Sequence, residues 1–107
     1  MDLKLEKQKN ELLQEVQSRG YESLRYCLLE SENVHKREWE NRIDFENGKY
    51  LVYATMDRAS YNKKREFENF EDAKQRFFEL LDLTVKINRR NVEKNKPTEY
   101  SSPLWSD

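Results

Sequence analysis

The single histidine and the single cysteine are the residues from which a metal site or a nucleophilic site would be built most simply. His35 lies in the polar stretch SENVHK, and Cys27 lies in the stretch RYCLL. A metal site needs several His, Cys or carboxylate ligands that converge, and a nucleophilic cysteine needs an activating base. Neither residue has an obvious partner of this kind, so we interpret His35 as a solvated turn residue and Cys27 as a small buried side chain.

The other patterns that could support catalysis are also incomplete. Ser60 has no plausible His–acid pair, and a chain whose only glycines are Gly20 and Gly48 has no glycine-rich phosphate loop. Asp44 and Glu46 share one face of a predicted strand, but paired catalytic carboxylates need a pocket that raises the pKa of one of them. The sequence therefore predicts a protein that is not an enzyme and that holds no cofactor and no metal.

A β-hairpin is the strongest structural signal in the chain. Residues 38–46 alternate apolar and polar side chains, and the Asn47-Gly48 pair that follows is favoured in a type I′ turn because both positions need a positive φ. A two-residue turn here fixes a register in which Arg42 faces Tyr53. The face of the hairpin that we predict to belong to the core consists of Trp39, Ile43, Phe45, Tyr50, Val52, Ala54 and Met56.

The opposite face of the hairpin is expected to contact solvent, and it carries residues that could bind a partner. Leu51 and Tyr53 stand there among charged side chains, and an arginine opposite Tyr53 permits a cation–π contact. Aromatic and arginine anchors inside a charged rim are the usual anatomy of a protein–protein hot spot. In the alternative arrangement, the N-terminal helix or the C-terminal tail covers Leu51 and Tyr53, for instance through Trp105 or Tyr100.

Two helices flank the strands. An apolar stripe at helical spacing predicts a helix over residues 3–18, and Gly20 is a stop signal just beyond its end. Asn69 is a suitable N-cap for a second, longer helix over residues 70–92, with Asp72 at the capping-box position. The second helix is predicted to be the main core partner of the sheet.

Two further strands complete the predicted fold. Residues 21–30 read as a strand, and residues 63–67 as a short fourth strand. Together with the hairpin they predict an α+β fold with the element order αββββα. In this fold a four-stranded antiparallel meander sheet packs against the N- and C-terminal helices.

The chain length of 107 residues is typical of one domain. We assign residues 1–96 to a single α+β domain and residues 97–107 to a C-terminal tail. The tail contains Pro and Ser, but Tyr100, Leu104 and Trp105 are unusual in a free tail and could dock on the body of the domain.

Charge and composition restrict the partners and the location. The formal net charge is −1, from 20 basic and 21 acidic residues, which argues against a dedicated nucleic-acid binder. Tyr61 and the basic run Lys63–Arg65 nevertheless resemble a nucleic-acid contact segment, so a nucleic-acid or ribonucleoprotein accessory domain is the alternative function. One cysteine, a charged N-terminus and no membrane-length apolar run predict a cytoplasmic protein.

Three short motifs follow one another between Gly48 and Leu81. They are a G-x-Y-x-V-Y-x-T strand, a turn with the sequence Asp-Arg-Ala-Ser, and a motif that starts at a Phe and leads into a long helix with Ala, Phe and Leu at fixed spacing. Through these motifs the chain resembles small bacterial immunity proteins found beside polymorphic toxins of LXG-type secretion systems. The residues that carry the resemblance are Gly48, Tyr50, Val52, Tyr53, Thr55, Asp57, Arg58, Ala59, Ser60, Phe67, Glu71, Asp72, Ala73, Phe77 and Leu81.

The resemblance implies a non-enzymatic, cytoplasmic protein that takes part in bacterial competition. It would bind and neutralise one partner, the C-terminal domain of a cognate toxin, by occluding the active face of that domain. The turn Asp57–Ser60 is the part of the motif that core packing does not explain. The residues that we predict to bind the partner are Glu40, Arg42, Asp44, Glu46, Leu51, Tyr53, Asp57, Arg58 and Tyr61.

Overall fold

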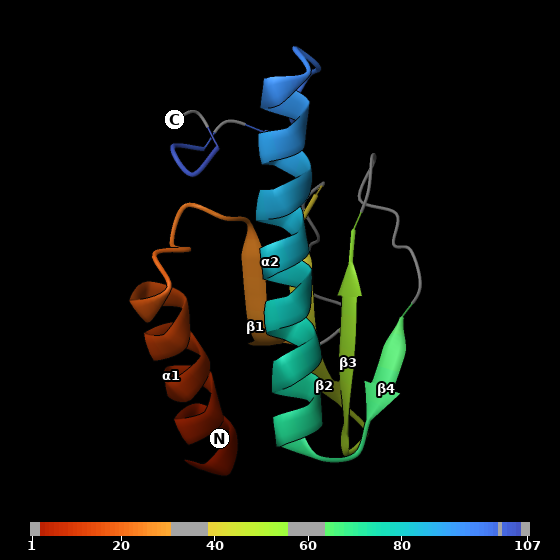
Figure 1. The fold of residues 1–107 in the computed structure, drawn as a ribbon. Helices are drawn as coiled ribbons and strands as arrows, with labels where there is room; N and C mark the ends of the chain where they lie inside the picture. Colours follow the sequence, from red (N-terminus) through yellow and green to blue (C-terminus); the bar gives the residue numbers. More distant parts are fainter. Residues whose placement is uncertain (1–2, 31–38, 56–63, 101, 106–107) are drawn as a thin grey trace.

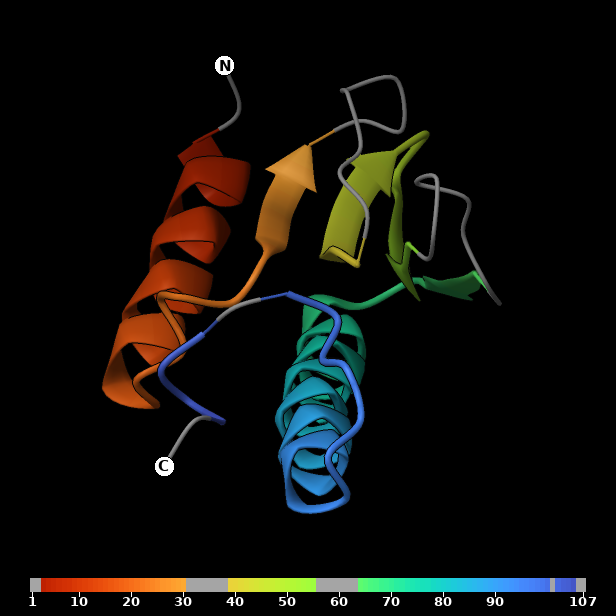
Figure 2. The same cartoon turned by 90° about the horizontal axis from the view of Figure 1, so that it is seen from above.

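The fold consists of two helices and one four-stranded sheet. The computed structural model describes residues 3–30, 39–55, 64–100 and 102–105. Helix α1 packs against strand β1, and helix α2 packs against the other strands on one side of the sheet and runs roughly along them (Figures 1 and 2). The elements, in chain order, are α1 (Leu3–Ser18), β1 (Tyr26–Glu30), β2 (Asn41–Glu46), β3 (Lys49–Ala54), β4 (Arg65–Phe67) and α2 (Phe70–Glu93).

Helix α1 ends at a glycine in the left-handed conformation. Gly20 has a φ of +74°, and its N–H donates to the carbonyl oxygen of Gln17 at 3.1 Å. The N–H of Tyr21 donates to the carbonyl oxygen of Val16 at 2.9 Å. These two hydrogen bonds form a Schellman motif, which satisfies carbonyl groups that the last turn of a helix leaves without partners. The predicted helix over residues 3–18 and its stop signal are confirmed.

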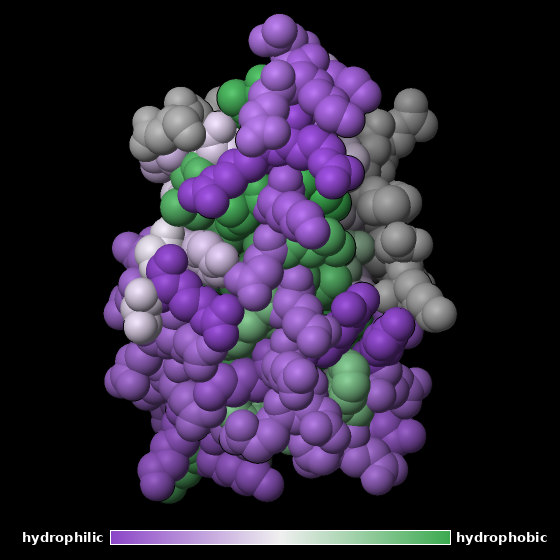
Figure 3. Space-filling view, viewed as in Figure 1, coloured by the Kyte–Doolittle hydropathy of each residue, from purple (hydrophilic) through white to green (hydrophobic). Residues whose placement is uncertain are grey.

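Asn69 is the N-cap of helix α2, and its side chain accepts a hydrogen bond from the N–H of Asp72 at 2.8 Å. The acidic side chains of Glu71 and Asp72 in the first turn interact favourably with the helix dipole. The helix extends one residue beyond the predicted range of 70–92. On the side shown in Figure 3, side chains beside the lower half of α2 are hydrophilic, and hydrophobic ones gather beside its upper half.

The hairpin of β2 and β3 has the predicted register. Arg42 pairs with Tyr53, and the pairing continues to Glu46 and Lys49 on either side of the turn. Asn47 and Gly48 have φ values of +54° and +77°, as a type I′ turn requires. Strand β4 is antiparallel to β3, so the predicted fourth strand is confirmed over Arg65–Phe67.

The prediction of a purely antiparallel sheet is wrong at β1. This strand is parallel to β2, with Tyr26 beside Asn41 and Leu28 beside Ile43, so the sheet is mixed although its strand order is β1-β2-β3-β4. A parallel pair cannot be joined by a two-residue hairpin turn, and the sequence between the two strands has no Asn-Gly pair like the one between β2 and β3. The strand is also shorter than predicted, because residues before Tyr26 form a turn after α1.

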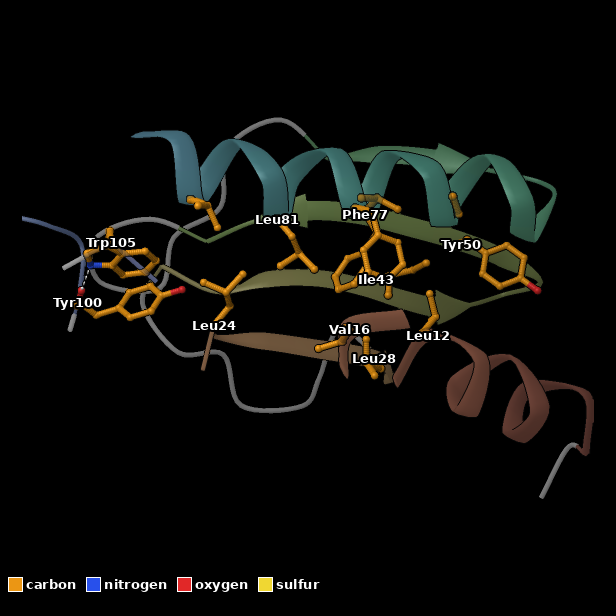
Figure 4. Packing of buried hydrophobic residues seen from close by; sticks show 14 residues of the cluster. Leu12, Val16, Leu24, Leu28, Ile43, Tyr50, Phe77, Leu81, Tyr100 and Trp105 are labelled. Carbon is orange, nitrogen blue, oxygen red and sulfur yellow. Dashed lines mark hydrogen bonds between the residues drawn. The ribbon is translucent and has the colours of Figure 1, made fainter. Parts of the chain in front are cut away.

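The hydrophobic core lies between the sheet and the two helices. The hairpin contributes Ile43, Tyr50 and Val52, each at most 5% exposed. Trp39 and Phe45 pack against this cluster and are partly buried, so the predicted core face is confirmed for these five residues, and Met56 lies outside the described residues. Figure 4 shows how the helices and the hairpin share the core. The helices contribute Leu12, Val16, Ala73, Phe77, Phe78, Leu81 and Val85.

The C-terminal segment contributes two aromatic rings to the same core. The rings of Tyr100 and Trp105 pack edge to face with their centroids 5.1 Å apart, and the indole Nε1–H of Trp105 donates to the carbonyl oxygen of Tyr100 at 3.0 Å. The Tyr100 hydroxyl accepts from the N–H of Arg25 at 3.0 Å. Leu104 packs against the cluster and is partly buried. The division into a domain of residues 1–96 and a separate tail stays a prediction.

Neither described helix is both long enough and apolar enough to cross a membrane.

We expect the substitution Trp105→Ala to lower the free energy of unfolding by about 3–5 kcal/mol, because it leaves a cavity beside Tyr100 where a buried ring had been. Urea denaturation followed by circular dichroism measures this change. Lys96→Ala, at an exposed position nearby, is the control and should leave the midpoint unchanged. A Trp105→Ala variant as stable as the wild type would show that this segment does not contribute to the core.

Candidate functional site

The hairpin face that points away from the helices carries four interacting polar side chains, which we call the hairpin charge cluster. They are Glu40, Arg42, Asp44 and Tyr53. Arg42 and Asp44 alternate with Ile43 along β2 and therefore point to the opposite face from this core residue. Tyr53 pairs with Arg42 across the hairpin, and Glu40 directly precedes β2. The register of the hairpin thus brings together four of the nine predicted site residues.

The guanidinium of Arg42 is the centre of the hairpin charge cluster. Its Nη1–H donates to Oε1 of Glu40 at 2.9 Å, and its Nε–H donates to Oδ2 of Asp44 at 3.2 Å. Its Nη2 lies 3.1 Å from Oδ1 of Asp44, an ion-pair contact that lacks the alignment of a hydrogen bond. The hydroxyl of Tyr53 donates to Oδ2 of Asp44 at 2.6 Å. One cation therefore links two carboxylates, and a tyrosine from the neighbouring strand joins the second of them.

The hairpin charge cluster is buried, which contradicts the expectation that this face contacts solvent. Arg42 and Asp44 have exposed fractions of 0%, and Tyr53 has 1%. Alternating polar residues are typical of a solvated face, but charges that pair with one another can also be buried when their hydrogen bonds are nearly complete. In this hairpin the acidic residues and the arginine satisfy one another instead of contacting water.

Leu51, on the same face, is buried as well. It has an exposed fraction of 7% and, like Tyr53, does not belong to the core cluster that the helices cover. Tyr100 and Trp105, which were the candidates to cover this face, pack in that other cluster instead. The ammonium group of Lys64 lies 5.3 Å from the centre of the Tyr53 ring and is one described contact on this side.

Electrostatics fix the protonation of two members of the cluster. Burial alone would lower the pKa of Arg42, but the hydrogen bond and the charge of Asp44 outweigh this effect and raise it. Burial, together with the hydrogen bond to Asp44, raises the pKa of Tyr53. Arg42 is therefore a permanent cation and Tyr53 a neutral donor throughout the physiological pH range. Chemically, the cluster is a cross-link between the two strands rather than an acid–base pair.

The remaining predicted site residues are not part of the cluster. Glu46 is half-buried at the turn end of the hairpin, beside the exposed Lys49, whose ammonium group lies 3.4 Å from the carboxylate of Glu66. Asp57, Arg58 and Tyr61 lie outside the described residues. Among the residues that the structure describes, no three His, Cys, Asp or Glu side chains are grouped so that they could hold a metal ion.

A second feature was not predicted from the sequence. A hollow of about 250 Å³ lies between the C-terminal half of α2 and the sheet. Leu83 and Ile87, which line it, are 48% and 40% exposed, and Glu99 lines it from the segment after α2. The sequence predicted this helix only as the main core partner of the sheet and did not indicate that part of its apolar surface is exposed. We refer to this feature as the α2 hollow. It is lined by Trp39, Asn41, Ala54, Thr55, Leu80, Leu83, Thr84, Ile87 and Glu99.

The fold and these two features describe a small α+β domain whose hairpin is cross-linked internally and whose long helix offers apolar surface, as binding domains do. Residues 5–106 match the model of the family described as Immunity protein 59 (Imm59). The match covers nearly the whole chain, so this chain belongs to the Imm59 family. Comparisons with curated proteins and with solved structures gave no match.

Membership of the family confirms the predicted class of protein. An immunity protein has a protein toxin as its partner, and proteins of this class are in general not enzymes. The alternative function, nucleic-acid binding, is not favoured by this match.

Replacing Arg42 with Leu should lower the free energy of unfolding by about 3–5 kcal/mol, because it leaves the buried carboxylates of Glu40 and Asp44 without their cation. Chemical denaturation measures the loss. Arg65→Leu removes an exposed arginine from β4 and is the matched control. If Arg42→Leu unfolds at the wild-type denaturant concentration, the cluster does not hold the hairpin together.

The substitution Glu99→Gln should stabilise the protein at pH 7. Burial raises the pKa of Glu99, and the hydrogen bond from Asn88 opposes this shift only in part. A carboxyl pKa that is higher in the folded state than in the unfolded state means that ionisation of the group disfavours folding. The contribution of the protonated group to stability is therefore complete below the pKa of the unfolded state, about 4.3. It is lost as the pH rises through the pKa of the folded state. The midpoint of thermal unfolding should therefore be higher for Glu99→Gln than for wild type at pH 7, and the difference should vanish near pH 4. An equal midpoint at both pH values would contradict this account; Glu93→Gln, on the exposed end of α2, is the control.

Proposed function

We propose that this chain binds and neutralises the C-terminal domain of an LXG-type polymorphic toxin in the cytoplasm of the cell that produces it. The observation that carries the proposal is the Imm59 match over residues 5–106. The finer assignment to LXG-type toxins is supported by the sequence motifs between Gly48 and Leu81.

Neutralisation by this domain is an act of binding, in which a bound immunity protein covers the face of the toxin that would meet its substrate. A standard protein–protein interface takes ~800 Å² from each partner. The domain exposes 6968 Å² in total, so one of its faces is large enough to supply such an interface.

The predicted site residues enter the proposal in two roles. The hairpin charge cluster is buried, so its members act as positioning residues that hold β2 and β3 in register rather than as contacts with the toxin. Glu46 at the turn end, and Asp57, Arg58 and Tyr61 beyond β3, stay candidates for direct contact. In this role the acidic Glu46 would steer the approach of a partner.

The proposal is tested by co-expression with the toxin domain encoded beside the gene for this chain. Induction of the toxin domain alone should arrest growth, and co-expression of the wild-type chain should restore it. The purified chain should also form a stable complex with a catalytically inactivated toxin domain. Ile43→Asp, which places a charge in the middle of the core, is the unfolded control and should not protect. A folded wild-type chain that neither binds this domain nor restores growth would refute the proposed function.

A further inference from the structure

The α2 hollow combines exposed apolar side chains with a concave shape. Leu83 and Ile87 lie one turn apart on α2 and are 48% and 40% exposed. Figure 3 shows hydrophobic side chains gathered beside the upper half of α2, which is its C-terminal half. Single exposed apolar residues are ordinary, but here two of them adjoin a concave surface that a partner's side chain can fill.

Trp39 lines the sheet side of the hollow at a conformational cost. Its φ is +57°, in the left-handed region that bulky side chains rarely adopt. Such a backbone costs about 1–3 kcal/mol and persists where the surroundings impose it, most often at functional sites. One side of Trp39 packs against the hydrophobic core cluster, which holds the residue in place. The residue also lines the hollow.

Glu99 provides a negative charge in this apolar surrounding. Its Oε1 accepts a hydrogen bond from the side-chain amide of Asn88 at 3.2 Å, and its N–H donates to Oδ1 of Asn88 at 2.7 Å. Asn88 is fully buried, so it holds Glu99 in place at the rim. Across the described residues, the carboxylate of Glu99 thus contacts a neutral amide and no lysine or arginine. Burial raises its pKa, which shows that the site disfavours the charge in the absence of a cation.

We propose that the α2 hollow is the docking site for the toxin domain, and that the toxin inserts an apolar side chain there with a lysine or arginine beside it. This inference rests on the proposed function. The apolar side chain fills the space between Trp39, Leu83 and Ile87, and the cation pairs with Glu99. A few anchor residues in desolvated pockets carry most of the energy in protein–protein interfaces, and removing one partner of a buried charge pair costs affinity.

The apolar part is tested by measuring the affinity of purified variants for the toxin domain encoded beside this gene, by isothermal titration calorimetry. Ile87→Asp should weaken binding by roughly 30-fold or more, as the loss of a hot-spot contact does. Val92→Asp is the matched control, because Val92 lies on the same helix, is 41% exposed against 40% for Ile87, and does not line the hollow. It should bind like the wild type.

The charged part is tested with Glu99→Gln, which should weaken binding roughly tenfold, since it removes one partner of a desolvated charge pair. The same variant is expected to be at least as stable as the wild type, so a loss of affinity cannot come from unfolding. Glu93→Gln, at an exposed position near the end of α2, should leave the affinity unchanged.

The outcomes separate this inference from the proposed function. If the wild type binds the toxin domain and both Ile87→Asp and Glu99→Gln bind equally well, the hollow is not the docking site although the function stands. If Val92→Asp loses affinity as much as Ile87→Asp, the effect is not specific to the hollow and the assignment is overturned. If the wild type forms a dimer that Ile87→Asp dissociates, the occupant is a second copy of the chain and not the toxin. If the folded wild type does not bind the toxin domain at all, the proposed function fails and the docking site fails with it.

Discussion

The contact between Arg42 and Asp44 is the interaction on which the hairpin depends, because both groups are removed from water and each needs the other. A buried guanidinium is tolerated only when carboxylates surround it, and here Glu40 and Asp44 do so at 2.9–3.2 Å. A shift of the hairpin by one residue would turn these charges into the helix-side core and move Ile43 to the opposite face, among the groups that the charges now occupy. The cluster therefore fixes a single register, and β2, in the middle of the sheet, transmits that register to β1 and β3.

The burial of these charges leaves other surfaces of the domain for the binding that we propose. The side chains of the cluster are used inside the domain, so they have no surface to offer a partner. The long helix offers surface instead, since its apolar stripe is wider than the core can cover, and Leu83 and Ile87 remain exposed. Burial disfavours the charge of Glu99 in the free protein, and a cost in stability of this kind is consistent with the docking site that we propose.

The sequence predicted the parts of the fold that local chemistry decides. Gly20 and Asn69 set the ends of the two helices, and the Asn47-Gly48 turn set the register of the hairpin, each through hydrogen bonds within a few residues. The parallel pairing of β1 and β2 was missed, because strand direction depends on the path of a longer connection.

The candidate site was predicted only in part, for two reasons. Arg42, Asp44 and Tyr53 were correctly placed together, but alternation alone does not distinguish a solvated face from a buried face whose charges pair with one another. The α2 hollow was missed, because an apolar residue such as Ile87 looks the same in a sequence whether the core or a partner covers it.

The most direct test of docking at the α2 hollow is methyl NMR of the chain, labelled at Ile, Leu and Val, with and without the purified toxin domain. If the toxin domain docks in the α2 hollow, the methyl signals of Leu83 and Ile87 shift on binding. Those of Leu13 and Val92, which are exposed elsewhere, do not. Shifts of Leu13 and Val92 with none at Leu83 and Ile87 would contradict docking at this site.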